Sequence, residues 1–87
     1  MRVFIVVATR GSDAILRQIR SHNFPHYAVR NDAWLVASDS TTRELAESLE
    51  IRSGTAGAGL VCSIETYSGR LPKDVWEWLS LHEAKGE

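Results

Sequence analysis

The sequence predicts an α+β fold in which helices pack on a four-stranded antiparallel sheet. Two segments, Val3–Val7 and Ala33–Ala37, are apolar at every position, as is typical of strands covered on both faces. Thr41 and Glu44 have the spacing of a capping box, in which each side chain accepts a hydrogen bond from the other residue's backbone N–H at the start of a helix. Leucines four residues apart on that helix form a stripe that can pack on the preceding strand.

The first half of the chain reads as strand, helix and hairpin. Arg2–Ala8 is the first strand, and we place it inside the sheet because neither of its faces is polar. Ser12 is the predicted N-cap of the following helix, and Asn23 can end that helix in the left-handed conformation. His26–Arg30 has mixed polarity and belongs nearer an edge. The turn residues Asn31-Asp32 then predict an antiparallel hairpin with the third strand.

The second half adds a helix, a strand and a final helix. We expect the second helix to end after Ile51, at Gly54, and Leu60–Thr66 to form the fourth strand. Arg70-Leu71 can add a short fifth strand, and Pro72 suits the first position of a last helix. The apolar stripe of that C-terminal helix follows i, i+3, i+4 and i+7 spacing and consists of Val75, Trp78, Leu79 and His82.

The order βαββαβ, followed by a helix, predicts a ferredoxin-like sandwich. That topology has strand order 4-1-3-2 and carries both main helices on one face of the sheet. The two strands that are apolar on both faces are the first and the third, which are the inner strands of that order. A chain of 87 residues has room for one core, so residues 1–87 are predicted to form a single ferredoxin-like domain.

One face of this predicted sheet still needs a cover. Either the last helix folds across it, or a second copy of the chain stacks on it, because exposed apolar patches of several hundred Å² usually mark an interface. We predict a homodimer. Its interface would use the aromatic residues Trp34, Trp76 and Trp78, although aromatic side chains at such spacing also fit a core.

The composition is that of an ordinary globular protein, with 44% hydrophobic and 24% charged residues. The longest apolar run, Val3–Ala8, is far shorter than the about 20 residues that a membrane span requires, so we expect no membrane and a cytoplasmic protein. Cys62 is the single cysteine and lies in an apolar segment. We interpret it as a small buried hydrophobic residue rather than a reactive thiol.

The charge balance gives only a small hint of a ligand. The net charge of −1 gives no overall attraction to nucleic acid. Eight arginines stand against two lysines, however, and the guanidinium group suits phosphate better than an ammonium group does.

Two glycine-containing segments could bind phosphate. Gly54, Gly57 and Gly59 follow a helix and precede a strand, which is the reverse of the order in nucleotide-binding loops, so we reject a nucleotide site there. Thr9-Arg10-Gly11-Ser12 has the correct order and could hold an anion at the helix N-terminus. A plain turn with a capping serine explains the same residues and is about three times more probable.

No metal or cofactor site is predicted. His22 and His26 are four residues apart, but Phe24-Pro25 separates them and no cysteine pair completes a zinc site. No two carboxylates stand out as an acid–base couple.

With its elements placed, the chain resembles the SinR-family small proteins of bacteria and phages. These are related more distantly to the CRISPR-associated spacer-acquisition protein and to VapD-type toxins. The residues that carry the resemblance are mostly core positions along nearly the whole chain: Ala14-Ile15-Leu16 and Ile19, His26–Val29, Ala33–Asp39, Thr42, Glu44-Leu45 and Leu49, Leu60–Ile64, Gly69, Leu71-Pro72, Trp78-Leu79 and His82. The resemblance implies a dimeric sandwich.

The nuclease members of that wider group resemble one another in an acidic residue at the end of the first strand, which binds a divalent metal at the dimer interface. Here that region reads Val7-Ala8-Thr9-Arg10 and has no carboxylate. This departure argues against a metal-dependent nuclease.

Our leading hypothesis is a non-catalytic, dimeric protein that acts by binding, in a phage or mobile-element defence setting. If the ligand is nucleic acid, the expected contacts are Arg10, Arg17, Arg20 and Arg30. A first alternative is a nuclease or toxin that uses Asp13 or Asp32 in place of the missing acid. A second alternative is a structural or regulatory subunit whose sheet face or edge strand docks a different protein.

Overall fold

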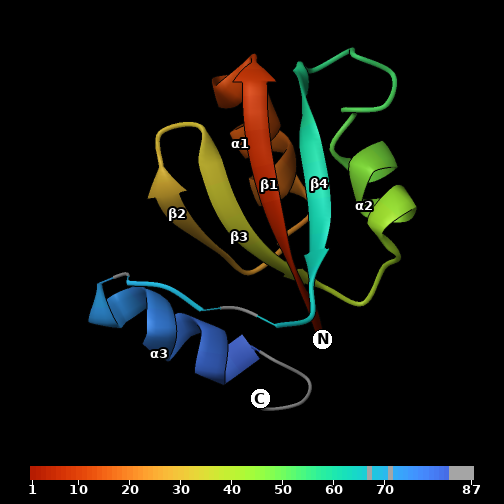
Figure 1. Cartoon of the computed structure of the whole chain (residues 1–87). Helices are drawn as coiled ribbons and strands as arrows, with labels where there is room; N and C mark the ends of the chain where they lie inside the picture. The colour runs from red at the N-terminus through yellow and green to blue at the C-terminus, as the bar shows by residue number, and fades with distance from the viewer. Residues whose placement is uncertain (67, 71, 83–87) are drawn as a thin grey trace.

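The described residues, 1–66, 68–70 and 72–82, form four strands and three helices in a computed structural model (Figure 1). The elements, in chain order, are β1 (Arg2–Arg10), α1 (Ser12–Ser21), β2 (His26–Arg30), β3 (Ala33–Ser38), α2 (Thr42–Ser48), β4 (Ala58–Ile64) and α3 (Lys73–His82).

The four strands form one antiparallel sheet in the order β2-β3-β1-β4, which reads β4-β1-β3-β2 from the other edge. The inner strands are therefore β1 and β3, the two whose sequences are apolar on both faces. On β1, Val6 pairs with Trp34 of β3 and with Val61 of β4. The β2–β3 hairpin turns at Asn31-Asp32, where the backbone N–H of Ala8 donates a hydrogen bond to the Asp32 carbonyl oxygen at 2.7 Å.

Helices α1 and α2 cover one face of the sheet, which we call the first face (Figure 1). Alternate residues of β1 and β3 point to this face because side chains alternate along a strand. They form the larger core with the apolar stripes of the two helices. Its buried members are Phe4, Val6, Ala8, Ile15, Ile19, Trp34, Val36, Leu45 and Leu49.

The opposite, second face carries a smaller core under α3. Val75 and Leu79 of α3 are buried against Val3 and Leu35 of the inner strands. Figure 1 shows α3 near the end of the sheet where β1 begins and β4 ends. The last helix therefore covers part of the face for which the sequence analysis predicts a stacked second copy. A stacked second copy is therefore not needed to bury the residues under α3. The homodimer itself stays a prediction.

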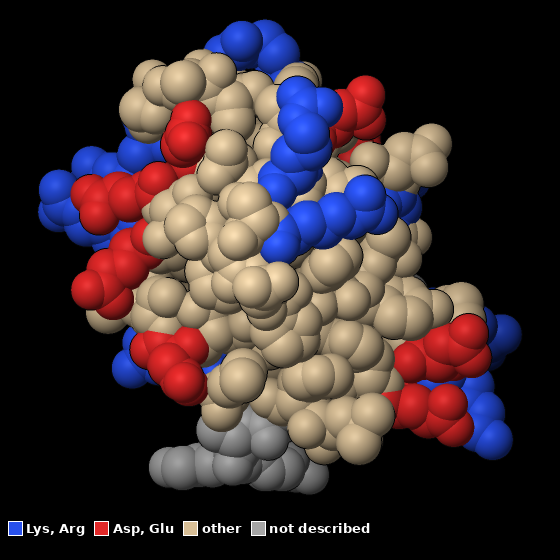
Figure 2. All heavy atoms as spheres, turned by 180° about the vertical axis from the view of Figure 1, so that it is seen from behind, with Lys and Arg blue, Asp and Glu red and all other residues tan. Residues whose placement is uncertain are grey.

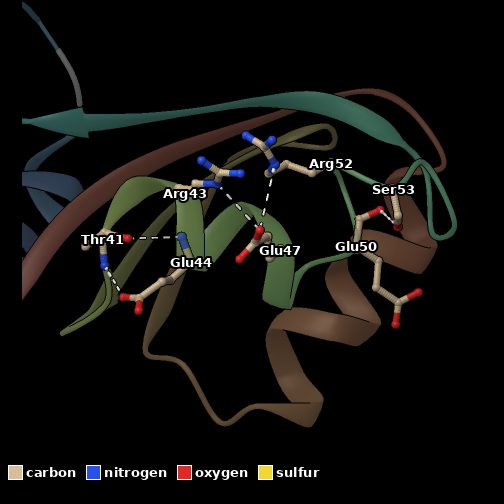
Figure 3. Close-up of polar contacts among 7 residues, drawn as sticks. All are labelled: Thr41, Arg43, Glu44, Glu47, Glu50, Arg52 and Ser53. Atoms are coloured by element: carbon tan, nitrogen blue, oxygen red, sulfur yellow. Dashed lines mark hydrogen bonds and ion pairs between the residues drawn. The ribbon is translucent and has the colours of Figure 1, made fainter.

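The predicted capping box at the start of α2 is confirmed. The Glu44 N–H donates to Thr41 Oγ1 at 3.1 Å, and the Thr41 N–H donates to Glu44 Oε1 at 2.9 Å (Figure 3). The predicted end of this helix is wrong. Helix α2 stops at Ser48, and Glu50 takes a left-handed conformation with φ 59°, so the chain turns before Ile51.

The predicted cap of α1 is also wrong. Gly11 rather than Ser12 is the N-cap, with φ 70°, and no side chain caps this helix. Glycine is needed here because a Cβ on Gly11 would lie 2.6 Å from the carbonyl oxygen of Ala56. At the other end of α1, Asn23 has φ 58°, which confirms the predicted left-handed residue.

The region after β4 differs from the expectation in detail. Strand β4 begins two residues earlier than predicted and ends at Ile64. Of the predicted fifth strand, Arg70 is not in a strand, and Leu71 lies outside the described residues. Pro72 directly precedes α3, and its carbonyl oxygen accepts a hydrogen bond from the Val75 N–H at 3.0 Å.

Replacing Thr41 with alanine should lower the free energy of unfolding by about 1 kcal/mol, because the capping hydrogen bond to the Glu44 N–H is lost. Urea denaturation followed by circular dichroism measures the change. Thr66→Ala is the matched control, since Thr66 is exposed and outside any helix or strand. An equal loss in both variants would contradict the assigned role of the cap.

Replacing Leu79 with alanine should lower the free energy of unfolding by about 2–5 kcal/mol, because a buried side chain leaves a cavity in the smaller core. The same denaturation assay applies. Leu81→Ala on the same helix is the control, since Leu81 is 79% exposed and should change stability little. A negligible effect of Leu79→Ala would mean that α3 does not pack on the second face.

Candidate nucleic-acid interface

The four arginines proposed as nucleic-acid contacts do not form one cluster. Arg10 ends β1 and Arg30 ends β2, whereas Arg17 and Arg20 lie on α1. All four are exposed. The structure therefore divides the predicted site into residues at strand ends and a pair on one helix.

Arg30 already has a carboxylate neighbour. Its Nε lies 3.8 Å from Asp32 Oδ1 across the hairpin turn, and both side chains are exposed. An exposed pair of this kind contributes little to stability, about 0–1 kcal/mol, but it lowers the positive charge that Arg30 can offer to a phosphate.

The cations of α2, of the segment that follows it and of α3 also have carboxylate neighbours. Glu47 Oε2 lies 3.6 Å from Arg43 Nε and 4.0 Å from Arg52 Nε, so that one carboxylate serves two guanidinium groups (Figure 3). On α3, Lys73 Nζ lies 3.9 Å from Glu77 Oε2.

Arg17 and Arg20 differ from these cations. Neither side chain makes an ion pair or a hydrogen bond with any residue in the described ranges. They are three residues apart on α1, so they are neighbours on its surface, while Ile15 and Ile19 face the core. Figure 2 shows the molecule from the side of the helical layer. Basic side chains extend there over a broad area without charge, and acidic residues surround that area, some of them beside the basic side chains.

Arg10 lies at a backbone crossing. A Cβ on Gly57, the residue before β4, would be 2.2 Å from the Arg10 carbonyl oxygen, so only glycine fits at position 57 without a shift of the backbone. The Arg10 side chain extends toward the connection between α2 and β4, since its Nη2 would be 3.9 Å from a Cβ on Gly54. Arg10 thus points away from an interface built on α1. The anion site predicted at Thr9–Ser12 stays a prediction.

The three tryptophans proposed as a dimer interface also separate. Trp34 is 2% exposed and belongs to the larger core, so its assignment to an interface is wrong. The reason is its position on β3, opposite Val6, from which it points toward α1 and α2. Trp76 and Trp78 are half-buried and pack against the smaller core. Their place in a dimer interface stays a prediction.

Cys62 is exposed, so its interpretation as a buried hydrophobic residue is wrong. Cys62 lies on β4 opposite Ile5, on the second face and at the edge of the sheet. The cover that α3 provides for Val3 and Leu35 stops short of this position. An apolar sequence segment was therefore no guide to burial on an edge strand.

The histidines have structural partners. The ring N–H groups of His22, His26 and His82 donate to the carbonyl oxygens of Ser48, Phe24 and Trp78 at 3.1, 2.9 and 2.9 Å. Within the described residues no three His, Cys, Asp or Glu side chains come together as metal ligands would. Asp13 and Asp32, the acids of the nuclease alternative, are both exposed.

No family model, curated protein or solved structure significantly matches the chain. None of the helices in the described part of the chain has the length and apolar character needed to cross a membrane.

Proposed function

We propose that this chain is a non-catalytic binding protein with a ferredoxin-like fold, and that it binds nucleic acid through the exposed side of α1. The observation that supports the proposal is the contrast in charge pairing. Arg17 and Arg20 have no carboxylate partner in the described structure, whereas Arg30, Arg43 and Arg52 each have one.

Two unpaired arginines on one helix suit a phosphate backbone. A guanidinium group binds phosphate oxygens through two parallel N–H donors, and its charge displaces the counterions that surround nucleic acid. Arg20 also lies in the last turn of α1, where the helix dipole favours a cation. Both side chains are thus held on a rigid element and form no ion pair within the described residues, although Asp13 lies one helical turn before Arg17. The expected resemblance to SinR-family proteins, together with the absence of a carboxylate from Val7–Arg10 of this chain, is consistent with a binding protein rather than a nuclease.

Binding through two arginines is electrostatic and therefore depends on salt. No base-reading element has been identified on α1, and phosphate contacts carry no direct sequence information. We therefore expect affinity for nucleic acid of many sequences, with strong weakening as the salt concentration rises.

Replacing Arg17 and Arg20 together with alanine should weaken binding of a short labelled RNA or DNA. It should also reduce the slope of log affinity against log salt by about 1.5, because two phosphate contacts are lost. Fluorescence anisotropy at several salt concentrations measures both quantities.

The matched control is the double variant Arg43→Ala and Arg52→Ala, which removes the same charge from a pair that has Glu47 as a shared carboxylate partner. Its salt slope should stay close to that of the unmodified chain. Equal losses in both double variants would mean that only net charge matters and would refute an interface on α1. Cleavage of the probe in the presence of Mg²⁺ would favour the nuclease alternative instead.

A further inference from the structure

The sheet has two edges, and the strands that form them differ in how well their own sequences prevent pairing. The edge strand β2 has five residues, follows Pro25 and ends in the charged Arg30. Its pairing with β3 also breaks register between Ala28 and Arg30. Proline, charge and a bulge are the devices by which natural proteins prevent a sheet edge from pairing with another chain.

Strand β4 has neither proline nor charge, and its pairing with β1 shifts register only at its first two residues, Ala58 and Gly59. Its seven residues, Ala58–Ile64, include no charged residue and no proline. Its register with β1 is unbroken from Gly59 to Ile64, and no other strand in the described structure pairs with its outer side. Leu60 is 60% exposed, and Cys62, on the same face, is exposed as well. A long, uncharged edge with exposed apolar side chains is a template for strand addition.

We propose that a second copy of this chain pairs its own β4 antiparallel with this edge, so that the two sheets become continuous. An antiparallel pair of identical strands is related by a two-fold axis, so the same surface serves both copies. Because β4 carries no charge, the pairing brings no like charges together. The proposal does not depend on the binding of nucleic acid.

A pairing centred on Val61 accounts for the exposed apolar residues. It places Leu60 opposite Cys62 of the second copy, and the two-fold axis repeats this contact. The four side chains then form one apolar cluster on the second face, beyond the region that α3 covers. Both groups that are exposed in the single chain would thereby become covered.

The same register brings opposite charges together at each end of the paired strands. Glu65, directly after β4, lies opposite Gly57 of the second copy, and Gly57 is next to Arg10. The two charged residues are then two strands apart, about 10 Å between backbones, a gap that their long side chains can span. Neither the Arg10 nor the Glu65 side chain makes an ion pair or hydrogen bond within the described residues of its own chain.

The two-fold axis also brings α2 beside α2 of the second copy, because this helix lies next to β4 (Figures 1 and 3). Arg43, Glu47 and Arg52 of this region carry both signs of charge. The helical layers can therefore meet without uniform repulsion.

Sedimentation equilibrium over a range of protein concentrations tests the proposal with the complete chain. The unmodified protein should form a reversible dimer. Leu60→Lys should raise its dissociation constant by about tenfold or more, because a lysine on an edge strand opposes pairing. Leu81→Lys replaces the other strongly exposed leucine, on α3, and should leave the dimer unchanged. Circular dichroism should show both variants folded, since both leucines are exposed.

A charge exchange tests the register. Arg10→Glu and Glu65→Arg should each raise the dissociation constant by about threefold at low salt, and the double variant should restore it. Restoration confirms the pairing centred on Val61, and failure to restore the dimer overturns it. A chain that stays monomeric at every concentration overturns strand addition altogether. A dimer that Leu81→Lys dissociates and Leu60→Lys does not would place the interface on α3 instead.

Discussion

The pairing of β1 with β3 brings together two strands that are apolar on both faces, and this constraint governs the rest of the structure. A sheet whose inner strands are apolar on both sides cannot leave either face to water without losing hydrophobic stabilisation. Helices α1 and α2 satisfy the requirement on the first face, where Phe4, Trp34 and Val36 are buried. On the second face the requirement falls on α3, a ten-residue helix with two buried side chains. This unequal coverage explains why the exposed apolar residues of β4 lie on the second face.

The charged residues also differ between α1 and the other two helices. In α2 and α3 acids follow bases at helical spacing, which brings Arg43 to Glu47 and Lys73 to Glu77. The charged residues of α1 are Asp13 in its first turn, followed by Arg17 and Arg20. The net charge of −1 does not show this difference. The arginines of α1 form no ion pair within the described residues, whereas Arg43 of α2 and Lys73 of α3 each have a carboxylate partner. The position of each charge, rather than the total, makes α1 the candidate interface.

Much of the fold could be predicted from local patterns. The bounds of β2, the capping box at Thr41 and the left-handed residue Asn23 follow from turn and capping chemistry acting over a few residues, and the structure has them. The errors arise where distant segments meet. The glycine at the N-terminus of α1 is set by its contact with Ala56, more than forty residues away in the sequence. The exposure of Cys62 depends on where the coverage by α3 ends. No local pattern contains that information.

The two proposals have a geometric connection. The two-fold axis of an antiparallel pair runs perpendicular to the sheet, so strand addition at β4 keeps the helical layers of both copies on the same face. Each α1 then presents Arg17 and Arg20 toward the same side of the extended sheet. A nucleic acid long enough to reach both helices would bind the second one as an intramolecular event, which raises the overall affinity without any new contact. A shorter one would engage a single α1 and gain nothing from dimerisation. The length of nucleic acid at which affinity rises therefore reports the spacing of the two helices. That spacing in turn depends on pairing through β4 rather than through α3.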